Sequence, residues 1–146
     1  MFLGRHNLTL DTKGRLSIPA KFREVLAAMY GNQVILTGLD QCIVVYPLPE
    51  WQKFEEKARQ LPSLKRDVRN FFRGFYYAAR ECALDRQGRV LIPPQLREYA
   101  GLDREVVLVG IANKMEIWSK ERWEEQVREN QSRLEEIAEE LAGIYF

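Results

Sequence analysis

The sequence predicts an α+β protein made of two similar halves, and three observations support this prediction. Two stretches of seventeen residues, 10–26 and 84–100, share eight identical positions. Downstream, the stretches 34–51 and 106–123 repeat one order of apolar, glycine and aromatic residues. Short apolar runs indicate strands, and apolar residues at helical spacing indicate helices between and after them. We therefore expect tandem, pseudo-symmetric units, the first domain spanning 1–76 and the second 77–146.

Each half begins with the motif L-D-x-x-G-R-x-x-I-P-x-x-x-R-E, which predicts two extended segments joined by a tight turn. After the first turn, Leu16 and Ile18 stand two residues apart, as in a half-buried strand. Both turns contain glycine, which adopts a positive φ angle without steric cost. The motif therefore predicts a hairpin around each of Gly14 and Gly88.

The remaining elements follow in the same order in both halves. Proline ends the second extended segment and starts a short helix, predicted at 20–29 and at 94–100. β-Branched and apolar residues then predict strands at 34–37, 43–46, 106–109 and 115–118. Pro49 and Ser119 stand where longer helices are expected to begin. Longer helices are predicted at 50–60, 63–76 and 120–142, the last of them acidic and amphipathic.

The composition argues against several functional classes. The 146 residues include one histidine and two cysteines, which are not spaced as metal ligands are. We therefore interpret Cys42 and Cys82 as buried structural thiols. No phosphate-binding glycine motif or nucleophile elbow occurs, so we expect no enzyme, cofactor, metal or small-molecule substrate. No apolar run of about eighteen residues and no signal peptide occurs, so we expect no membrane contact and a cytoplasmic location.

Charge is distributed unevenly along the chain, although its net value is only +1. Residues 1–30 carry a net charge of +3 and residues 63–97 carry +5, whereas residues 116–142 carry −5. Both copies of the repeated motif lie in the basic segments. This asymmetry predicts that one side of the molecule faces an anion.

The D-x-x-G-R part of the motif suits anion recognition. A carboxylate four residues before the arginine can accept hydrogen bonds from turn N–H groups and can pair with the guanidinium. A guanidinium held in this way fits guanine edges or phosphate. The pairs would be Asp11 with Arg15 and Asp85 with Arg89. The alternative is a purely structural salt bridge within the turn, and the residues alone leave the two readings about equal.

The predicted helix at 63–76 combines three arginines with a group of aromatic residues. Aromatic side chains can stack on nucleic-acid bases, but at helical spacing they more often pack in a core or an interface. A solvated helix face is the alternative interpretation of the arginines. The residues concerned are Arg66, Arg69, Arg73, Phe71, Phe72, Phe75 and Tyr76.

The quoted residues carry a resemblance to a known family. The stretch MFLGRHNLTLDTKGRLSIPAKFRE and the second copy of the motif resemble the MraZ family, over essentially the whole chain. That family comprises bacterial transcriptional regulators encoded at the head of the division and cell-wall gene cluster. The resemblance implies tandem SpoVT-AbrB-like swapped-hairpin domains that interleave into a β-barrel-like unit flanked by helices. It also implies a ring of subunits on the nucleoid that binds repeated boxes in double-stranded DNA upstream of the cluster, usually as a repressor.

The resemblance also assigns roles to residues. The functional arginines of the D-x-x-x-R motif fall on Arg15 and Arg89. The candidate DNA-binding residues are Arg15, Arg89, Lys13, Arg86, Arg5 and Lys21, with Asp11, Asp85, Gly14 and Gly88 as motif support. Arg23 and Arg97 are expected to add phosphate contacts. Since Lys13 has Gln87 as its counterpart, the two copies are not expected to contribute equally, and the first is the better candidate for base contact.

A second hypothesis comes from a different functional class. AbrB-like antitoxin domains bind toxins, so the chain could instead be a ring-forming protein-interaction module. Such antitoxins usually carry one hairpin domain and a disordered tail, whereas this chain carries a second complete copy and an amphipathic helix. The sequence therefore favours the DNA-binding regulator. Salt would discriminate between the two, because DNA binding weakens steeply with salt.

Overall fold

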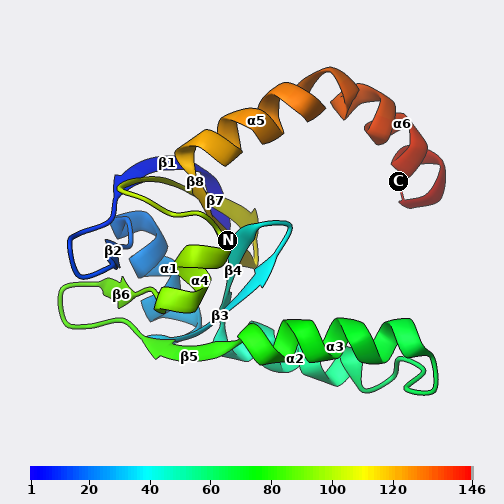
Figure 1. Ribbon diagram of the computed structural model, residues 1–146, viewed down its shortest axis with the longest axis horizontal. Coiled ribbons are helices and arrows are strands. Elements are labelled where there is room, and N and C mark those ends of the chain that lie inside the picture. The colour runs from blue at the N-terminus through cyan, green and yellow to red at the C-terminus, as the bar shows by residue number, and fades with distance from the viewer. Residues whose placement is uncertain (146) are drawn as a thin grey trace.

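The structure, a computed structural model, describes residues 1–145 and contains a six-stranded antiparallel sheet beside a two-stranded ribbon (Figure 1). The strands are β1 (Phe2–Thr9), β2 (Arg15–Ser17), β3 (Gln33–Leu39), β4 (Cys42–Pro47), β5 (Arg80–Ala83), β6 (Arg89–Leu91), β7 (Glu105–Ala112) and β8 (Lys114–Ser119). The helices are α1 (Ala20–Met29), α2 (Leu48–Ala58), α3 (Arg66–Ala78), α4 (Pro94–Tyr99), α5 (Lys120–Asn130), the 3₁₀ helix η1 (Gln131–Arg133) and α6 (Leu134–Tyr145). The predicted α+β class is confirmed, and so are the four strands expected after the short helices.

The two halves exchange strands. The sheet order is β1-β7-β8-β4-β3-β5, which reads the same from both ends when each strand is replaced by its counterpart in the other half. β1 pairs with β7, and β5 pairs with β3, so the first strand of each half joins the sheet of the other. β4 and β8 pair at the centre. Each half therefore depends on the other for its complete set of strand pairs.

The prediction of a paired hairpin around each glycine turn is wrong. β1 and β2 flank the first turn, but within residues 1–145 they do not pair with each other. β2 instead pairs with β6, the matching strand of the second half, and forms the ribbon. Alternating apolar residues identify a strand but not its partner, which depends on where the apolar face is buried. Closure of the sheet into a barrel and the swapped-hairpin architecture stay predictions, as does a domain boundary after residue 76.

The main hydrophobic core lies between one face of the sheet and a layer formed by the β2–β6 ribbon, α1 and α4. Leu16 and Val90 face this core from the ribbon, while Phe22, Leu26 and Leu96 face it from the helices. All five side chains are buried. The apolar face of the ribbon is thus fixed against the core, and its other face is left for solvent.

The opposite face of the sheet carries two smaller clusters under the longer helices. Under α2 and α3, the Trp51 ring stacks on Phe75 with centroids 5.8 Å apart, and both pack on Ile35. Under α5, Trp123 packs edge-on against Trp118 with centroids 5.7 Å apart. The aromatic residues of α3 therefore serve in part as core, which is the more common of the two uses considered for them.

The acidic helix predicted at 120–142 is interrupted. It begins where expected, since the Ser119 hydroxyl accepts a hydrogen bond of 3.1 Å from the Arg122 backbone N–H. The structure then places the 3₁₀ helix η1 between α5 and α6. Together these three elements form an arm that leads away from the sheet (Figure 1).

The structure also bears on membrane proteins and metalloproteins. Among residues 1–145, no helix combines the length and the apolar character needed to cross a membrane. The same residues contain no group of three or more histidine, cysteine, aspartate or glutamate side chains placed to hold a metal ion. Cys42 is a buried free thiol, as predicted, whereas Cys82 is only partly buried.

Candidate nucleic-acid interface

The first D-x-x-G-R turn is organised by one carboxylate. Asp11 Oδ1 accepts hydrogen bonds of 2.9 Å from the backbone N–H groups of Lys13 and Arg15. Asp11 Oδ2 accepts a hydrogen bond of 2.6 Å from Arg15 Nε. The Gly14 N–H closes the turn by donating to the Asp11 carbonyl oxygen at 3.0 Å. The aspartate therefore shapes the loop and orients the arginine at the same time.

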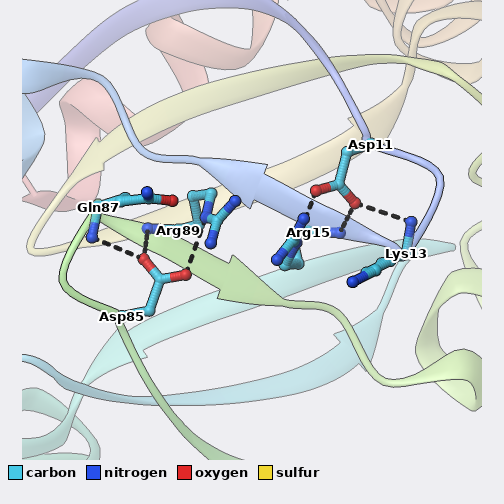
Figure 2. Close-up of polar contacts among 6 residues, drawn as sticks. All are labelled: Asp11, Lys13, Arg15, Asp85, Gln87 and Arg89. Carbon is cyan, nitrogen blue, oxygen red and sulfur yellow. Dashed lines mark hydrogen bonds and ion pairs between the residues drawn. The ribbon is translucent and has the colours of Figure 1, made fainter.

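The second turn repeats this geometry. Asp85 Oδ1 accepts hydrogen bonds of 2.9 Å from the backbone N–H groups of Gln87 and Arg89. Asp85 Oδ2 accepts a hydrogen bond of 2.8 Å from Arg89 Nε (Figure 2). In both turns the bond uses Nε, and within residues 1–145 the terminal nitrogens of the two arginines make no hydrogen bond. The fork of each guanidinium is therefore free to bind a ligand.

Hydrogen bonding lowers the pKa of both aspartates. The pKa of Asp11 falls from its ordinary value of 3.8 to about 2, chiefly because the backbone N–H of Arg15 donates to the carboxylate. The Arg15 side chain and the backbone N–H of Lys13 act in the same direction. The pKa of Asp85 is also lowered, with the Arg89 backbone N–H as the main cause. Both carboxylates are ionised at neutral pH and hold their arginines through charge-assisted bonds.

The two turns are joined by the ribbon. In the β2–β6 register Arg15 lies opposite Leu91, and Ser17 lies opposite Arg89. The Ile18 N–H donates to the carbonyl oxygen of Gly88 at 2.9 Å, and the equivalent bond runs from Ile92 to Gly14. One Asp–Arg pair consequently stands at each end of the ribbon (Figure 2).

Both arginines project from the same face of the ribbon. Successive residues of a strand point to opposite faces, and Leu16 and Val90 occupy the buried face. Arg15 and Arg89 therefore lie on the outer face as diagonal neighbours. Leu91 on this face is 55% exposed. The outer face of the ribbon, with its two arginines, is the candidate interface.

The glycine of each turn is contacted by the other half of the chain. Gly14 and Gly88 have φ angles of +83° and +75°, and both are buried. A Cβ atom at Gly14 would collide with the guanidinium of Arg97, and one at Gly88 would collide with the side chain of Arg23. Each of these arginines thus reaches from its own half of the chain to the turn of the other half.

This crossing is what the sequence reasoning missed. It assigned Arg23 and Arg97 to phosphate contacts, whereas the structure packs each of them over the glycine of the opposite turn. Arg97 Nε also donates a hydrogen bond of 3.1 Å to the Ile92 carbonyl oxygen. The signal was present in the motif, because the arginine stands eight residues after the G-R pair in both copies.

The other candidate residues occupy different elements. Lys13 and Arg86 lie in the two turns and are exposed, next to the Asp–Arg pairs. Lys21 is exposed on α1. Arg5 is exposed on β1, where its guanidinium donates hydrogen bonds of 3.3 and 3.1 Å to Asn7 Oδ1. Lys13 and Arg86 therefore lie in the turns that flank the candidate interface. Arg5 and Lys21 lie farther along the chain, on β1 and α1.

The helix at 66–78 is placed on the other side of the sheet, with its aromatic cluster against α2. Arg69 Nη1 donates to the carbonyl oxygens of Ser63 and Leu64, at 3.1 and 2.7 Å. Arg69 thereby fixes the loop that joins α2 to α3. Its position gives this arginine a structural use.

Comparison with known proteins agrees with this duplicated architecture. The family model "MraZ protein, putative antitoxin-like" matches the chain twice, over residues 1–74 and 75–144. A protein of Moorella thermoacetica named "Transcriptional regulator MraZ" is 51% identical over 144 residues, which cover 99% of each chain. The protein of the same name from Pelotomaculum thermopropionicum is 48% identical over 145 residues, covering 99% of this chain and 97% of its own. A third, from Syntrophomonas wolfei, is 49% identical over 99% of both chains.

The two family matches divide the chain into the same halves that carry the two Asp–Arg turns and exchange strands. Identity of about half the residues extends over nearly the full length of the relatives. The chain therefore belongs to the MraZ family.

Proposed function

We propose that the chain is a DNA-binding transcriptional regulator that reads double-stranded DNA with the outer face of the β2–β6 ribbon. Its relatives carry the name of transcriptional regulators. We further propose that it acts as a repressor, without enzymatic activity, at repeated boxes upstream of the division and cell-wall gene cluster. We propose that it binds DNA on the nucleoid, in the cytoplasm.

The observation that carries the proposal is the pair of oriented arginines on one solvent face. The major groove of B-DNA is about 12 Å wide and admits a two-stranded ribbon. An arginine fork can donate two hydrogen bonds to O6 and N7 of one guanine. Asp11 and Asp85 hold the Nε atoms and leave the terminal nitrogens of Arg15 and Arg89 available to a ligand. A rigid arginine loses little conformational entropy on binding, so this orientation favours base recognition over loose phosphate contact.

Phosphate contacts are the proposed task of the surrounding basic residues. Lys13 and Arg86 flank the ribbon in the two turns, and Arg5 and Lys21 extend the basic surface. Such contacts bring affinity without sequence preference and fix the register of the protein on the duplex. The Arg15 turn, which carries Lys13, is proposed as the stronger of the two half-sites.

One chain offers only two base-reading arginines, so we propose that several subunits bind several boxes together. Linking binding events in this way raises affinity by orders of magnitude without new contacts in any one subunit. We propose a ring of subunits, each a pair of interleaved swapped-hairpin domains. The acidic arm formed by α5, η1 and α6 faces away from DNA in this arrangement.

A second candidate is a protein-interaction module of the antitoxin type. The description of the matching family model includes the term antitoxin-like. The exposed apolar residues of the arm would supply the binding surface for a protein partner. This candidate predicts binding that depends little on salt.

The test is a mobility-shift assay with DNA from upstream of the chain's own gene cluster, using the wild-type protein and Arg15→Ala across a salt series. Each phosphate contact contributes about −0.9 to the slope of log affinity against log salt concentration. We expect steep salt dependence for wild type and specific binding about 10- to 100-fold weaker for Arg15→Ala. Arg128→Ala, which removes an exposed arginine from α5, is the matched control and should bind as wild type does. Failure of wild type to bind at low salt would contradict the proposal.

A further inference from the structure

A groove of about 560 Å³, here called the α3–α4 groove, lies between α3, α4 and the end of β3. Its walls are mainly apolar, with Phe71 and Tyr77 from α3 and Leu96 and Tyr99 from α4. Pockets that bind small organic molecules have volumes of about 300–1,000 Å³ and walls of this composition. Phe71, Tyr77 and Tyr99 are 42%, 76% and 43% exposed, so a ligand can reach the groove from solvent.

A glycine in the interior of α3 keeps this groove open. Gly74 lines the groove, and a Cβ atom added to it would have no neighbour among residues 1–145 within 4 Å. Glycine destabilises a helix interior relative to alanine or leucine, so helix formation does not explain its presence. Close packing does not explain it either, because the space beside it is empty. The missing side chain instead provides room inside the groove.

Two exposed amide side chains that line the groove, Asn70 and Gln95, offer N–H donors. The Asn70 Oδ1 atom accepts a hydrogen bond of 3.0 Å from Arg73 Nη1. The Gln95 Oε1 atom accepts one of 3.0 Å from Arg80 Nη2, and Arg80 Nη1 also donates to two carbonyl oxygens at the C-terminal end of α3. Because the arginines occupy the amide oxygens, the amide nitrogens are left for an acceptor on a ligand.

The same two arginines give the rim of the groove a positive charge. Among residues 1–145, neither Arg73 nor Arg80 forms an ion pair with a carboxylate. The described lining of the groove contains no acidic residue either. Two cations and two amide donors therefore border an otherwise apolar space. A ligand with an apolar body and one carboxylate satisfies both features, whereas an uncharged or cationic ligand leaves the arginines without a counter-charge.

The groove shares helix α4 with the first Asp–Arg turn. Leu96 and Tyr99 line the groove from this six-residue helix, and Arg97 between them packs over Gly14. A Cβ atom at Gly14 would lie 2.7 Å from Arg97 Cζ, so the guanidinium is in close contact with the turn. Displacement of α4 toward the turn meets this contact, and displacement away from the turn releases Arg97. A ligand that moves α4 therefore disturbs the turn that orients Arg15.

We propose that the α3–α4 groove binds a small amphipathic carboxylate, with an apolar body and one acidic group, and that this ligand weakens recognition of DNA by the first turn. The groove has no equivalent in the second half, because α6, the counterpart of α3, belongs to the arm that leads away from the sheet (Figure 1). By linkage, DNA weakens binding of the ligand by the same factor. The binding site stands independently of the proposed function, whereas the effect on DNA rests on it.

Titration calorimetry of the full-length protein without DNA tests the site, with decanoate as the probe below the concentration at which it forms micelles. We expect decanoate to bind about 10-fold more tightly than decan-1-ol or decyltrimethylammonium, because neither of these offers a carboxylate to the arginines. Gly74→Leu fills the groove and should abolish binding while favouring the helix, and circular dichroism checks the fold. Gly143→Leu makes the same change in α6, where an added Cβ also meets nothing within 4 Å, and should bind as wild type does.

Replacement of the rim arginines separates the contribution of the acid from that of the chain. Arg73→Gln/Arg80→Gln should reduce the affinity for decanoate to that for decan-1-ol and leave the affinity for the alcohol unchanged. Absence of decanoate binding to wild type, equal binding of the three probes, or undiminished binding to Gly74→Leu would overturn the proposal. If no probe binds and Gly74→Leu alters the mass of the protein in solution, the groove holds a protein segment instead.

A mobility-shift assay with and without decanoate tests the regulation. Saturating decanoate should weaken DNA binding by wild type about 5-fold or more and should leave DNA binding by Gly74→Leu unchanged. If wild type binds decanoate but no DNA under any condition, only the proposed function fails. If DNA binding holds and decanoate does not bind, only this inference fails. Decanoate that binds without weakening DNA binding would overturn the regulatory effect.

Discussion

The two D-x-x-G-R turns have nearly the same geometry but different surface chemistry. In both, the carboxylate accepts two backbone hydrogen bonds of 2.9 Å and one bond from the arginine Nε. The exposed middle residues differ, since the first turn has Thr12 and Lys13 and the second has Arg86 and Gln87. Each turn thus carries one extra cation, but it is shifted by one position.

The comparison distinguishes the residues that build each turn, here called the frame (aspartate, glycine and arginine), from the exposed middle residues. The residues that build the turn must satisfy the same backbone donors twice, so aspartate, glycine and arginine recur. The exposed middle residues take part in the turn only through their backbone, as the N–H groups of Lys13 and Gln87 do, so their side chains are free to differ. We therefore expect substitutions of the frame to act alike in both turns and substitutions of the exposed positions to act differently.

Replacing Arg15 or Arg89, the arginines proposed to recognise DNA bases, should have the largest effect on specific DNA binding. A bidentate arginine–guanine contact contributes about 1–3 kcal/mol of discrimination. We expect Arg15→Ala and Arg89→Ala each to weaken specific DNA binding about 10- to 100-fold, with Arg15→Ala the more severe, and the double variant to lose it. Titration in mobility-shift assays measures the affinities. Equal losses would show that the neighbouring cations do not distinguish the turns.

Alanine at the turn glycines should affect stability equally in the two halves. A left-handed backbone costs a residue with a Cβ about 1–2 kcal/mol, and Arg97 or Arg23 must also move. We expect Gly14→Ala and Gly88→Ala each to lower the free energy of unfolding in urea by about 1–2 kcal/mol. Gly74→Ala in α3 is the control, since nothing lies within 4 Å of its added Cβ and its φ is ordinary. A Gly14→Ala protein as stable as wild type would contradict the crossed packing.

Neutralising the aspartates should produce a pH-dependent loss of stability. Because the pKa of Asp11 is lowered to about 2 in the folded chain, its stabilising contribution is complete above the ordinary value of 3.8. That contribution disappears as the pH falls through about 2. We expect Asp11→Asn to be less stable than wild type at pH 6, with a difference that vanishes toward pH 2. Asp85→Asn should behave in the same direction.

Urea titrations at several pH values measure these differences. A gap between wild type and Asp11→Asn that stayed constant from pH 6 to pH 2 would show that the carboxylate charge does not hold the turn.

The smallest effect is expected when one turn is converted into the other. Thr12→Arg/Lys13→Gln gives the first turn the exposed residues of the second while keeping its net charge. Since one phosphate contact is moved and none is lost, we expect affinity to change only about 2- to 3-fold and the salt slope to stay the same. Base preference should move toward a two-fold symmetric box, which selection from a random DNA pool would reveal. An unchanged base preference would show that Arg15 and Arg89 alone determine which bases are recognised.

Much of the fold was accessible from the repeated motif. The duplication predicted the element order, the glycine turns and the Asp–Arg pairs, because each rests on local chemistry that a short window contains. Ser119 was expected to start a helix for the same reason, and its side chain caps α5.

Features that depend on distant contacts were not accessible. The apolar alternation around Leu16 did not reveal that β2 pairs with β6. The positions of Arg23 and Arg97 depend on how one half folds over the other. The interruption at 131–133 has no proline or glycine to announce it, so the helical pattern of 120–142 continued through it.

Because the two halves exchange strands, the chain resembles a dimer whose two subunits have been joined covalently. A dimer of identical subunits carries every substitution twice, so its two reading turns stay alike and it is matched to palindromic sites. Here a covalent link joins the two copies, and a change such as Lys13 opposite Gln87 affects one turn only. If the ribbon reads DNA as proposed, this difference gives the molecule polarity on the duplex, with a distinguishable first and second end, and successive copies would line up along directly repeated boxes in one orientation.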